Sequence, residues 1–147
     1  MPTQIDYSKI NRRALDLLLS TKKHTTSVNK RLKALIEIRV SQINGCAYCV
    51  DLHSTEAREL GENQQRLDCL PVWKESQLFG IDEMVALDWA ENVTNISIAT
   101  DIHDKLEVLL QHYSEPEVVD ITFVVAVINS LNRLAISLGD KPSIRNQ

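Results

Sequence analysis

A long apolar stretch near the C-terminus, from Val118 to Leu138, sets the architecture of this chain. The four residues before it, 114–117, read Ser-Glu-Pro-Glu, which is a helix capping box with proline in the first turn, where a helix tolerates it. Gly139 follows the stretch, at the position where a left-handed residue ends a helix. Because the stretch is apolar almost all round, we expect a long helix that is buried centrally or at a subunit interface.

Apolar residues also recur with helical spacing in the rest of the chain, and no segment alternates like a β-strand. Ser8, Ser27 and Asp82 are expected to cap helices. The expected helices cover residues 8–19, 27–43, 46–60, 64–70, 82–93, 101–113 and 118–138. We therefore predict an all-α protein, a single compact domain of about six to seven helices that spans residues 1–147.

The charge pattern and the N-terminus exclude several classes of protein. The formal net charge is −4 and no basic run stands out, which argues against a nucleic-acid partner. Residues 1–10 lack the apolar core of a signal peptide, and the longest apolar run, residues 121–129, is too short to cross a bilayer. We expect a cytoplasmic protein with no membrane partner.

The chain has three cysteines, an odd number that argues against a framework of structural disulfides in a reducing compartment. Cys46 and Cys49 are separated by two residues, a spacing that indicates a catalytic or metal-binding role. Cys69 has no such neighbour and is expected to be a packed thiol.

His53 is in phase with this cysteine pair. On one helix, the side chains of Cys46, Cys49 and His53 fall within about 60° of one another. Cys46 sits at the expected helix start, where unpaired N–H groups favour the thiolate, which is the nucleophilic form of cysteine. His53 can take a proton from Cys49 and later return it to a leaving group. In this scheme Cys49 attacks, and Cys46 resolves the product as a disulfide.

The same spacing is compatible with two less reactive roles for the cysteines. They can be buried packing residues, or they can belong to a zinc site. A structural zinc site needs four ligands, and the remaining cysteines and histidines, which are Cys69, His24, His103 and His112, show no paired spacing. These three histidines are expected at the surface. The pattern of haem attachment is absent, as are phosphate-binding loops and dinucleotide fingerprints, so we expect no cofactor.

Residues 39–49, Arg-Val-Ser-Gln-Ile-Asn-Gly-Cys-Ala-Tyr-Cys, with His53 following, resemble the core motif of the alkylhydroperoxidase/carboxymuconolactone decarboxylase superfamily, the AhpD-like proteins. The resemblance continues through residues 56–62, 73–75, 86–91 and 128–136, and so covers most of the chain. The central motif is specific, because it combines the cysteine pair, the histidine and the residues that precede them.

The resemblance implies an all-helical subunit with its CxxC at a helix N-terminus near a subunit interface, assembled as a homotrimer or homohexamer. It implies thiol-dependent reduction of hydroperoxides, in which Cys49 attacks, Cys46 resolves and His53 serves as base and acid. The reductant would be a protein dithiol, such as a lipoylated partner. The decarboxylase branch generally lacks the cysteine pair, so that activity is not expected. The alternatives are a protein dithiol–disulfide oxidoreductase, a redox sensor and a non-enzymatic zinc-binding oligomer.

One position departs from the family pattern. The peroxidase members carry a relay glutamate twelve residues before the first cysteine, where this chain has Ala34. Glu37 lies one turn later, within about 60° of Ala34 around the helix, and can supply the carboxylate from a shifted position. Alternatively, Glu37 is an ordinary exposed helical residue.

A few further residues carry structural expectations. Arg39 lies on an apolar stripe and needs a carboxylate, which Glu91 or Asp88 can provide. Ser41 either hydrogen-bonds near the site or is satisfied by its own helix. The remaining expectations concern buried residues: a polar cluster or interface around Asn132 and Arg133, and core positions for Trp73, Trp89 and Phe123.

Overall fold

The computed structural model describes residues 3–146, and every regular element in this range is helical. The order is α1 (Tyr7–Ile10), α2 (Arg12–Ser20), the 3-10 helix η1 (Thr21–Lys23), α3 (Lys30–Asn44), α4 (Ala47–Glu59), α5 (Gln64–Cys69), η2 (Leu70–Val72), α6 (Trp73–Ser76), α7 (Ile81–Thr94), α8 (Ile102–His112) and α9 (Glu115–Leu138). The all-α prediction is confirmed, and each expected helix has a counterpart.

The expected first helix is two helices, because Asn11 interrupts it. The side chain of Asn11 accepts a hydrogen bond from the backbone N–H of Ala14 and caps α2, while Asp6 caps α1 in the same way. The prediction that Ser8 is a cap is wrong. Ser8 lies inside α1 and donates to Asp6 Oδ1 at 2.6 Å.

The starts of α3 and α7 also differ from the prediction. Asn29 caps α3, whereas Ser27 donates its hydroxyl to Asp120 Oδ2 at 2.6 Å and ties the preceding loop to α9. Gly80 occupies the N-cap position of α7, and Asp82 lies in the first turn, where its charge favours the helix dipole. At the start of α3 the contact of Ser27 with Asp120 left Asn29 as the cap, whereas at the start of α7 the side chain of Glu83 accepts a hydrogen bond from the backbone N–H of Gly80.

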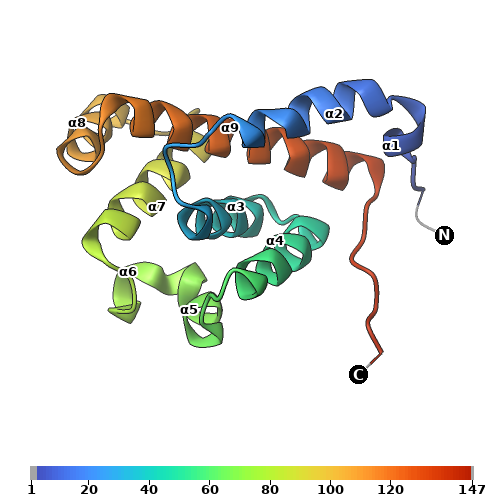
Figure 1. Cartoon of the computed structure of the whole chain (residues 1–147), viewed down its shortest axis with the longest axis horizontal. Helices are drawn as coiled ribbons and strands as arrows, with labels where there is room; N and C mark the ends of the chain where they lie inside the picture. The colour runs from blue at the N-terminus through green and yellow to red at the C-terminus, as the bar shows by residue number, and fades with distance from the viewer. Residues whose placement is uncertain (1–2, 147) are drawn as a thin grey trace.

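Helix α3 is the central element (Figure 1) and contacts α4, α7 and α9. Its buried residues serve two hydrophobic clusters on opposite sides. Leu32, Ile36 and Val40 pack with α7, α8 and α9, while Leu35 and Ile38 pack with α4, α5 and η2. A helix enclosed on both sides has almost no solvated face, so any charged residue on it must find a partner.

Helix α9 lies across one side of the molecule (Figure 1). The capping box at Ser114 is confirmed, and Gly139 ends α9 with φ of 90°. By length and composition the whole of α9 is apolar enough to cross a membrane. The sequence prediction considered only the uninterrupted apolar run of residues 121–129, which is too short to do so. A core helix passes the same test, and 39% of the most apolar part of α9 is buried inside this fold. Phe123 is an exception to the predicted core, because it is 52% exposed.

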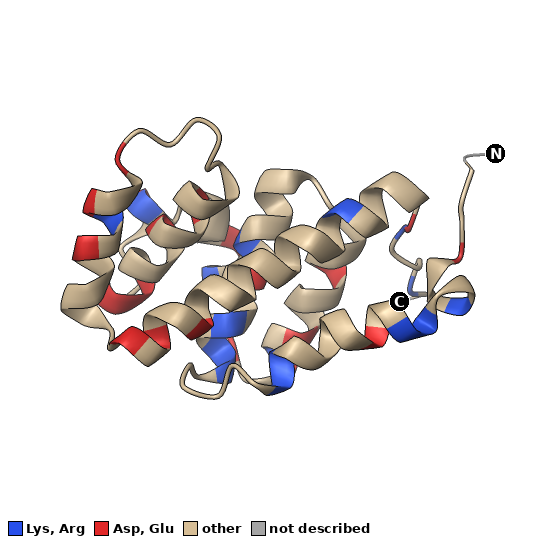
Figure 2. Ribbon diagram, turned by 90° about the horizontal axis from the view of Figure 1, so that it is seen from above, with Lys and Arg blue, Asp and Glu red and all other residues tan. Residues whose placement is uncertain are grey.

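Acidic and basic residues are interspersed along most of the surface (Figure 2). Arg12 and Arg13 lie in α2, and Lys22 and Lys23 lie in η1. Helix α2 has no buried residue, and Leu17 on it is 65% exposed. Helix α2 therefore carries an exposed apolar side chain, as α9 does at Phe123.

Candidate active site

The turn between α3 and α4 brings the two cysteines to a helix start. Gly45 ends α3 in the left-handed conformation, with φ of 74°, which costs glycine no steric strain. The next backbone N–H, that of Cys46, donates to the carbonyl of Ser41 at 2.9 Å. The chain thus reverses within a few residues and begins α4 at Ala47, so the prediction that the CxxC lies at a helix N-terminus is confirmed.

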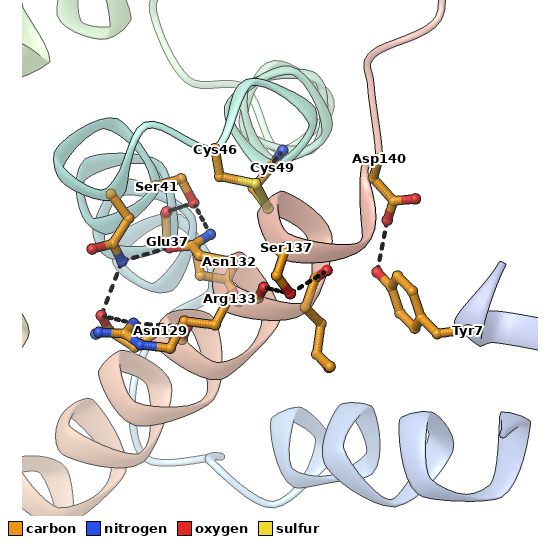
Figure 3. The surroundings of a disulfide bond; sticks show 12 residues. Tyr7, Glu37, Ser41, Cys46, Cys49, Asn129, Asn132, Arg133, Ser137 and Asp140 are labelled. Atoms are coloured by element: carbon orange, nitrogen blue, oxygen red, sulfur yellow. Dashed lines mark hydrogen bonds between the residues drawn. A yellow bond between two sulfur atoms is a disulfide. The ribbon is translucent and has the colours of Figure 1, made fainter. Parts of the chain in front are cut away.

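Cys46 is the N-cap residue of α4. Its sulfur accepts a hydrogen bond from the backbone N–H of Cys49 at 3.3 Å, and the two cysteines form a disulfide with a Cα–Cα distance of 5.3 Å. Both are buried, and they pack against Ala135 of α9 (Figure 3). Once the bond is reduced, the same N–H groups and the helix dipole favour a thiolate at this position.

His53 lies one turn after Cys49 on α4 and is only 3% exposed. Its Nδ1 is 2.8 Å from Glu56 Oε2 and 3.2 Å from Glu37 Oε2. Both neighbours are carboxylate oxygens, which only accept hydrogen bonds, so Nδ1 carries a proton. The other ring nitrogen, Nε2, is then the one available to the cysteine at i−4, which is a neighbour on the same helix face.

Glu37 connects this histidine to α3 and to η1. It is 5% exposed, and its other oxygen, Oε1, is 2.7 Å from Nζ of Lys22. Burial alone would raise the pKa of Glu37, but the hydrogen bonds from His53 and Lys22 outweigh it and hold the pKa below its usual range. Burial likewise lowers the pKa of His53, but the carboxylates of Glu37 and Glu56 overcome this effect and raise it. The four side chains form a charged cluster of alternating sign.

A second set of polar side chains anchors the α3–α4 turn to α9 (Figure 3). Asn132, which is fully buried, donates to Ser41 Oγ at 3.0 Å and accepts from Asn44 Nδ2 at 2.9 Å. Ser41 in turn donates to the carbonyl of Glu37 at 2.7 Å. Asn44 also donates to Asn129 at 2.9 Å. The residues before Cys46 are therefore fixed by side chains of the long helix.

Several of these residues lie where the sequence predicts. Cys46, Cys49 and His53 share one helix as expected, and Glu37 reaches His53 instead of facing solvent. Ala34 is buried in the second hydrophobic cluster. Arg39 pairs with Glu91, with 2.8 Å between Nε and Oε1.

Asn132 is buried within the predicted polar cluster, and Arg133, which is exposed, donates to the carbonyl and to Oδ1 of Asn129 in the same cluster. His112 was expected at the surface, but it is half-buried and its Nδ1 is 2.8 Å from Asp82 Oδ1. Arg133 lies on the outer side of α9, and His112 meets a residue that is distant in the sequence. Periodicity along one element could reveal neither feature.

Lys22 and Glu56 belong to the site but were not predicted from the sequence. Glu56 follows His53 by three residues on one helix, so its proximity could have been inferred from the spacing. Lys22 lies in a short polar segment far from the motif, and only the packing of η1 brings it to Glu37. Among residues 3–146, the side chains of Glu37, His53 and Glu56 are also close enough to hold a metal ion, and neither cysteine belongs to this group.

The chain belongs to the carboxymuconolactone decarboxylase family, whose model matches residues 12–92. It is 34% identical over 143 residues to the uncharacterized protein YdfG of Bacillus subtilis, a match that covers 96% of this chain and 97% of that protein. This family membership confirms the resemblance that the CxxC motif suggested.

Solved structures support the same assignment. A protein of unknown function from Agrobacterium tumefaciens, ATU0492, which has been suggested to be the antioxidant defence protein AhpD, is 34% identical with a TM-score of 0.90 over 98% of this chain and all of that one. The debrominase Bmp8 shares the fold, with a TM-score of 0.78 over 88% of this chain and 69% of that one, at 22% identity. The AhpD-like fold is therefore shown.

Proposed function

We propose that this protein is a thiol-dependent alkyl hydroperoxide reductase. The observation that carries the proposal is the cluster at the start of α4, in which a buried cysteine pair precedes a histidine that two carboxylates hold in one orientation. Similarity to ATU0492, with its suggested role in antioxidant defence, supports the same assignment. The reaction needs a thiolate, an acid for the leaving oxygen and a second thiol, and each role has a residue here.

In the first step the Cys49 thiolate attacks the terminal oxygen of the hydroperoxide. The O–O bond breaks, the alkoxide takes a proton from His53 Nε2 and leaves as an alcohol, and Cys49 becomes a sulfenic acid. Glu37 and Glu56 hold the ring by Nδ1, so Nε2 can give and take protons without reorientation. Cys46 then attacks the sulfur of Cys49, which releases water and forms the disulfide.

A dithiol must return the two electrons, and we propose a protein dithiol, such as one on a lipoyl group, as the partner. The same chemistry without peroxide defines the second candidate, a dithiol–disulfide oxidoreductase. A cleft that reaches Cys46 favours it, because thiol exchange needs access to one sulfur. A redox sensor would use the same disulfide without turnover, and a zinc-binding oligomer would leave the thiols blocked by metal.

We also propose that the chain forms a homotrimer or homohexamer. Leu17 of α2 and both Val119 and Phe123 of α9 are each exposed to more than half of their full extent. An apolar surface of this kind is expected at contacts between subunits. Light scattering coupled to size-exclusion chromatography tests this directly, and a monomer at micromolar concentration would contradict it.

The test of the peroxidase activity uses reduced protein and a stoichiometric amount of an organic hydroperoxide. The expected result is rapid peroxide loss together with an intact mass lower by two hydrogen atoms. Cys69→Ser serves as the control and should behave like the wild type, because Cys69 is a free, half-buried cysteine outside the site. Unconsumed peroxide with both thiols intact would contradict the proposal and leave disulfide exchange to be tested.

A further inference from the structure

A cleft of about 560 Å³ opens beside the disulfide, where α3 ends and along α4. Its described lining residues come from one stretch of the sequence, residues 41–58, with the exception of Arg145. Cys46 lines the same cleft and is only 1% exposed. A reagent that approaches Cys46 from this side therefore passes a side chain that the C-terminal segment supplies.

The base of the C-terminal segment is fixed to the body of the protein. The segment leaves the end of α9 without regular structure, and residues 141–146 are all exposed (Figure 1). At the base, Asp140 accepts a hydrogen bond from the hydroxyl of Tyr7 at 2.7 Å. The backbone N–H of Ile5 donates to the carbonyl of Leu138 at 3.0 Å, which holds the end of α9 as well.

The tip of the segment is held by Arg145. Its guanidinium forms an ion pair with Asp51 of α4 and donates to the hydroxyl of Thr55 at 3.4 Å. Residues 141–144, all of which the structure describes, make no hydrogen bond. The side chains of the ion pair are 58% and 29% exposed, and a pair of this kind is weak and is screened by salt. The tip can therefore detach while the base stays in place.

We propose that residues 141–146 form a strap that restricts access to Cys46, and that the ion pair between Arg145 and Asp51 is its latch. While the latch is closed, Arg145 forms one wall of the cleft. When the latch opens, this wall is removed and solvent reaches Sγ of Cys46. Cys49 does not line the cleft, so the strap acts on the resolving cysteine and not on the attacking one. The inference rests on the proposed function only in that Cys46 is a reacting residue, and it adds a control on its access.

The test measures the access to Cys46 directly. In the reduced Cys49→Ser/Cys69→Ser background Cys46 is the one cysteine left, and its alkylation by iodoacetamide, a small uncharged reagent, is followed by intact mass. The rate is measured across pH, so the thiol pKa and the limiting rate of the thiolate are obtained separately. A reagent that reacts only with the open form reports the population of that form.

Two changes release the strap in this background. We expect Arg145→Gln, and a chain that ends at Ser143, each to raise the limiting rate by about two- to fivefold, the range that an exposed ion pair supplies. The matched control is Arg58→Gln, because Arg58 lines the same cleft and no carboxylate within residues 3–146 pairs with it. This variant removes the same charge without releasing the strap, so its limiting rate should stay at the starting value.

The latch itself is tested by exchanging its charges. Asp51→Asn should raise the limiting rate as Arg145→Gln does, and the charge-swapped variant Asp51→Arg/Arg145→Asp should restore the slow rate. High salt should accelerate the full chain and leave the shortened chain unchanged.

Equal limiting rates in the full and shortened chains would overturn the proposal, as would an equal increase in Arg58→Gln. No peroxide is used in these measurements. A protein that fails to consume hydroperoxide but shows the expected alkylation rates would contradict the peroxidase proposal and leave the strap established, so the two failures are distinguishable.

Discussion

Glu37 and Glu62 are buried to the same degree, with exposed fractions of 5% and 7%, but their partners differ. Glu62 pairs with Arg66 at 2.8 Å and with Arg31 at 3.5 Å, and Arg66 continues to Glu83 at 2.6 Å. Arginine stays charged at every accessible pH, so the arginines of this cluster keep their charge and hold the helices together by ion pairs. Glu37 instead faces a lysine and an imidazole that titrates near neutrality.

Burial and ion pairing alone therefore do not mark a reactive site. In both clusters the carboxylate pKa lies below its usual range, because hydrogen bonds and opposite charge outweigh burial. What distinguishes Glu37 is that its partner can exchange a proton and lies one helical turn from a cysteine. Substitutions can separate the two clusters, and the largest effect is expected at the histidine itself.

His53→Asn keeps a donor near the position of Nδ1 but removes Nε2. The rate of Cys49 oxidation by an organic hydroperoxide should fall by about 10³-fold, within the range supplied by a positioned acid–base group. The matched control is His112→Asn, because His112 also pairs through Nδ1 with a carboxylate, Asp82. Stopped-flow measurement of peroxide loss decides, and an equal decrease in both variants would show that the effect is not local.

Glu37→Gln and Glu62→Gln remove one carboxylate from each cluster. We expect Glu37→Gln to slow Cys49 oxidation by about 10²-fold, since the imidazole loses its anionic partner. Glu62→Gln should leave the rate unchanged. It should lower the free energy of unfolding by about 2 kcal/mol, which is less than for a fully buried ion pair because the arginine partners are partly exposed to solvent. Single-turnover kinetics and urea denaturation test both. A slow Glu62→Gln variant would remove the distinction between the clusters.

The stability contribution of the Glu37–His53 pair should depend on pH. The lowered pKa of Glu37 contributes stability above the ordinary carboxyl value of 4.5, and this is lost as the pH falls through the lowered pKa. The raised pKa of His53 contributes stability below its ordinary value of 6.5, and this is lost as the pH rises through the raised pKa. Glu37→Gln should therefore be most destabilising between these values, by about 3 kcal/mol. Urea denaturation across pH measures the profile, and a flat difference would contradict it.

The smallest expected effect is on the titration of His53. Glu56→Gln removes an anionic hydrogen-bond acceptor and should lower the pKa of His53, whereas Lys22→Met removes a nearby positive charge and should raise it. Titration of the imidazole followed by NMR gives both directions in one experiment. Shifts of the same sign in both variants would show that the cluster does not control His53 as described.

The helical fold and the position of the CxxC were predictable from the sequence because both depend on local patterns. Periodicity located every long helix, and the Asn44-Gly45 turn placed Cys46 at a helix start. Helix starts were less predictable, since Ser27 and Asn29 are both good caps and the contact of Ser27 with Asp120 decided between them. Phe123 followed the apolar pattern of its helix but lies on the outer side.

The site was half predictable for the same reason. Cys46, Cys49 and His53 share one helix, so spacing alone aligned them. Lys22 joins the cluster only because η1, which contacts α9, places it beside Glu37, and no spacing within an element encodes that contact. For Glu37 the sequence predicted the helix on which it lies, but not whether its side chain faces His53 or solvent.

The most direct test of the proposed chemistry is to trap the sulfenic acid. Reduced Cys46→Ser is treated with one equivalent of organic hydroperoxide in the presence of dimedone, alongside Cys49→Ser. We expect a dimedone adduct on Cys49 in the first variant, and neither an adduct nor peroxide loss in the second. An adduct on Cys46 in Cys49→Ser, formed as fast as in its counterpart, would contradict the assignment of Cys49 as the attacking residue.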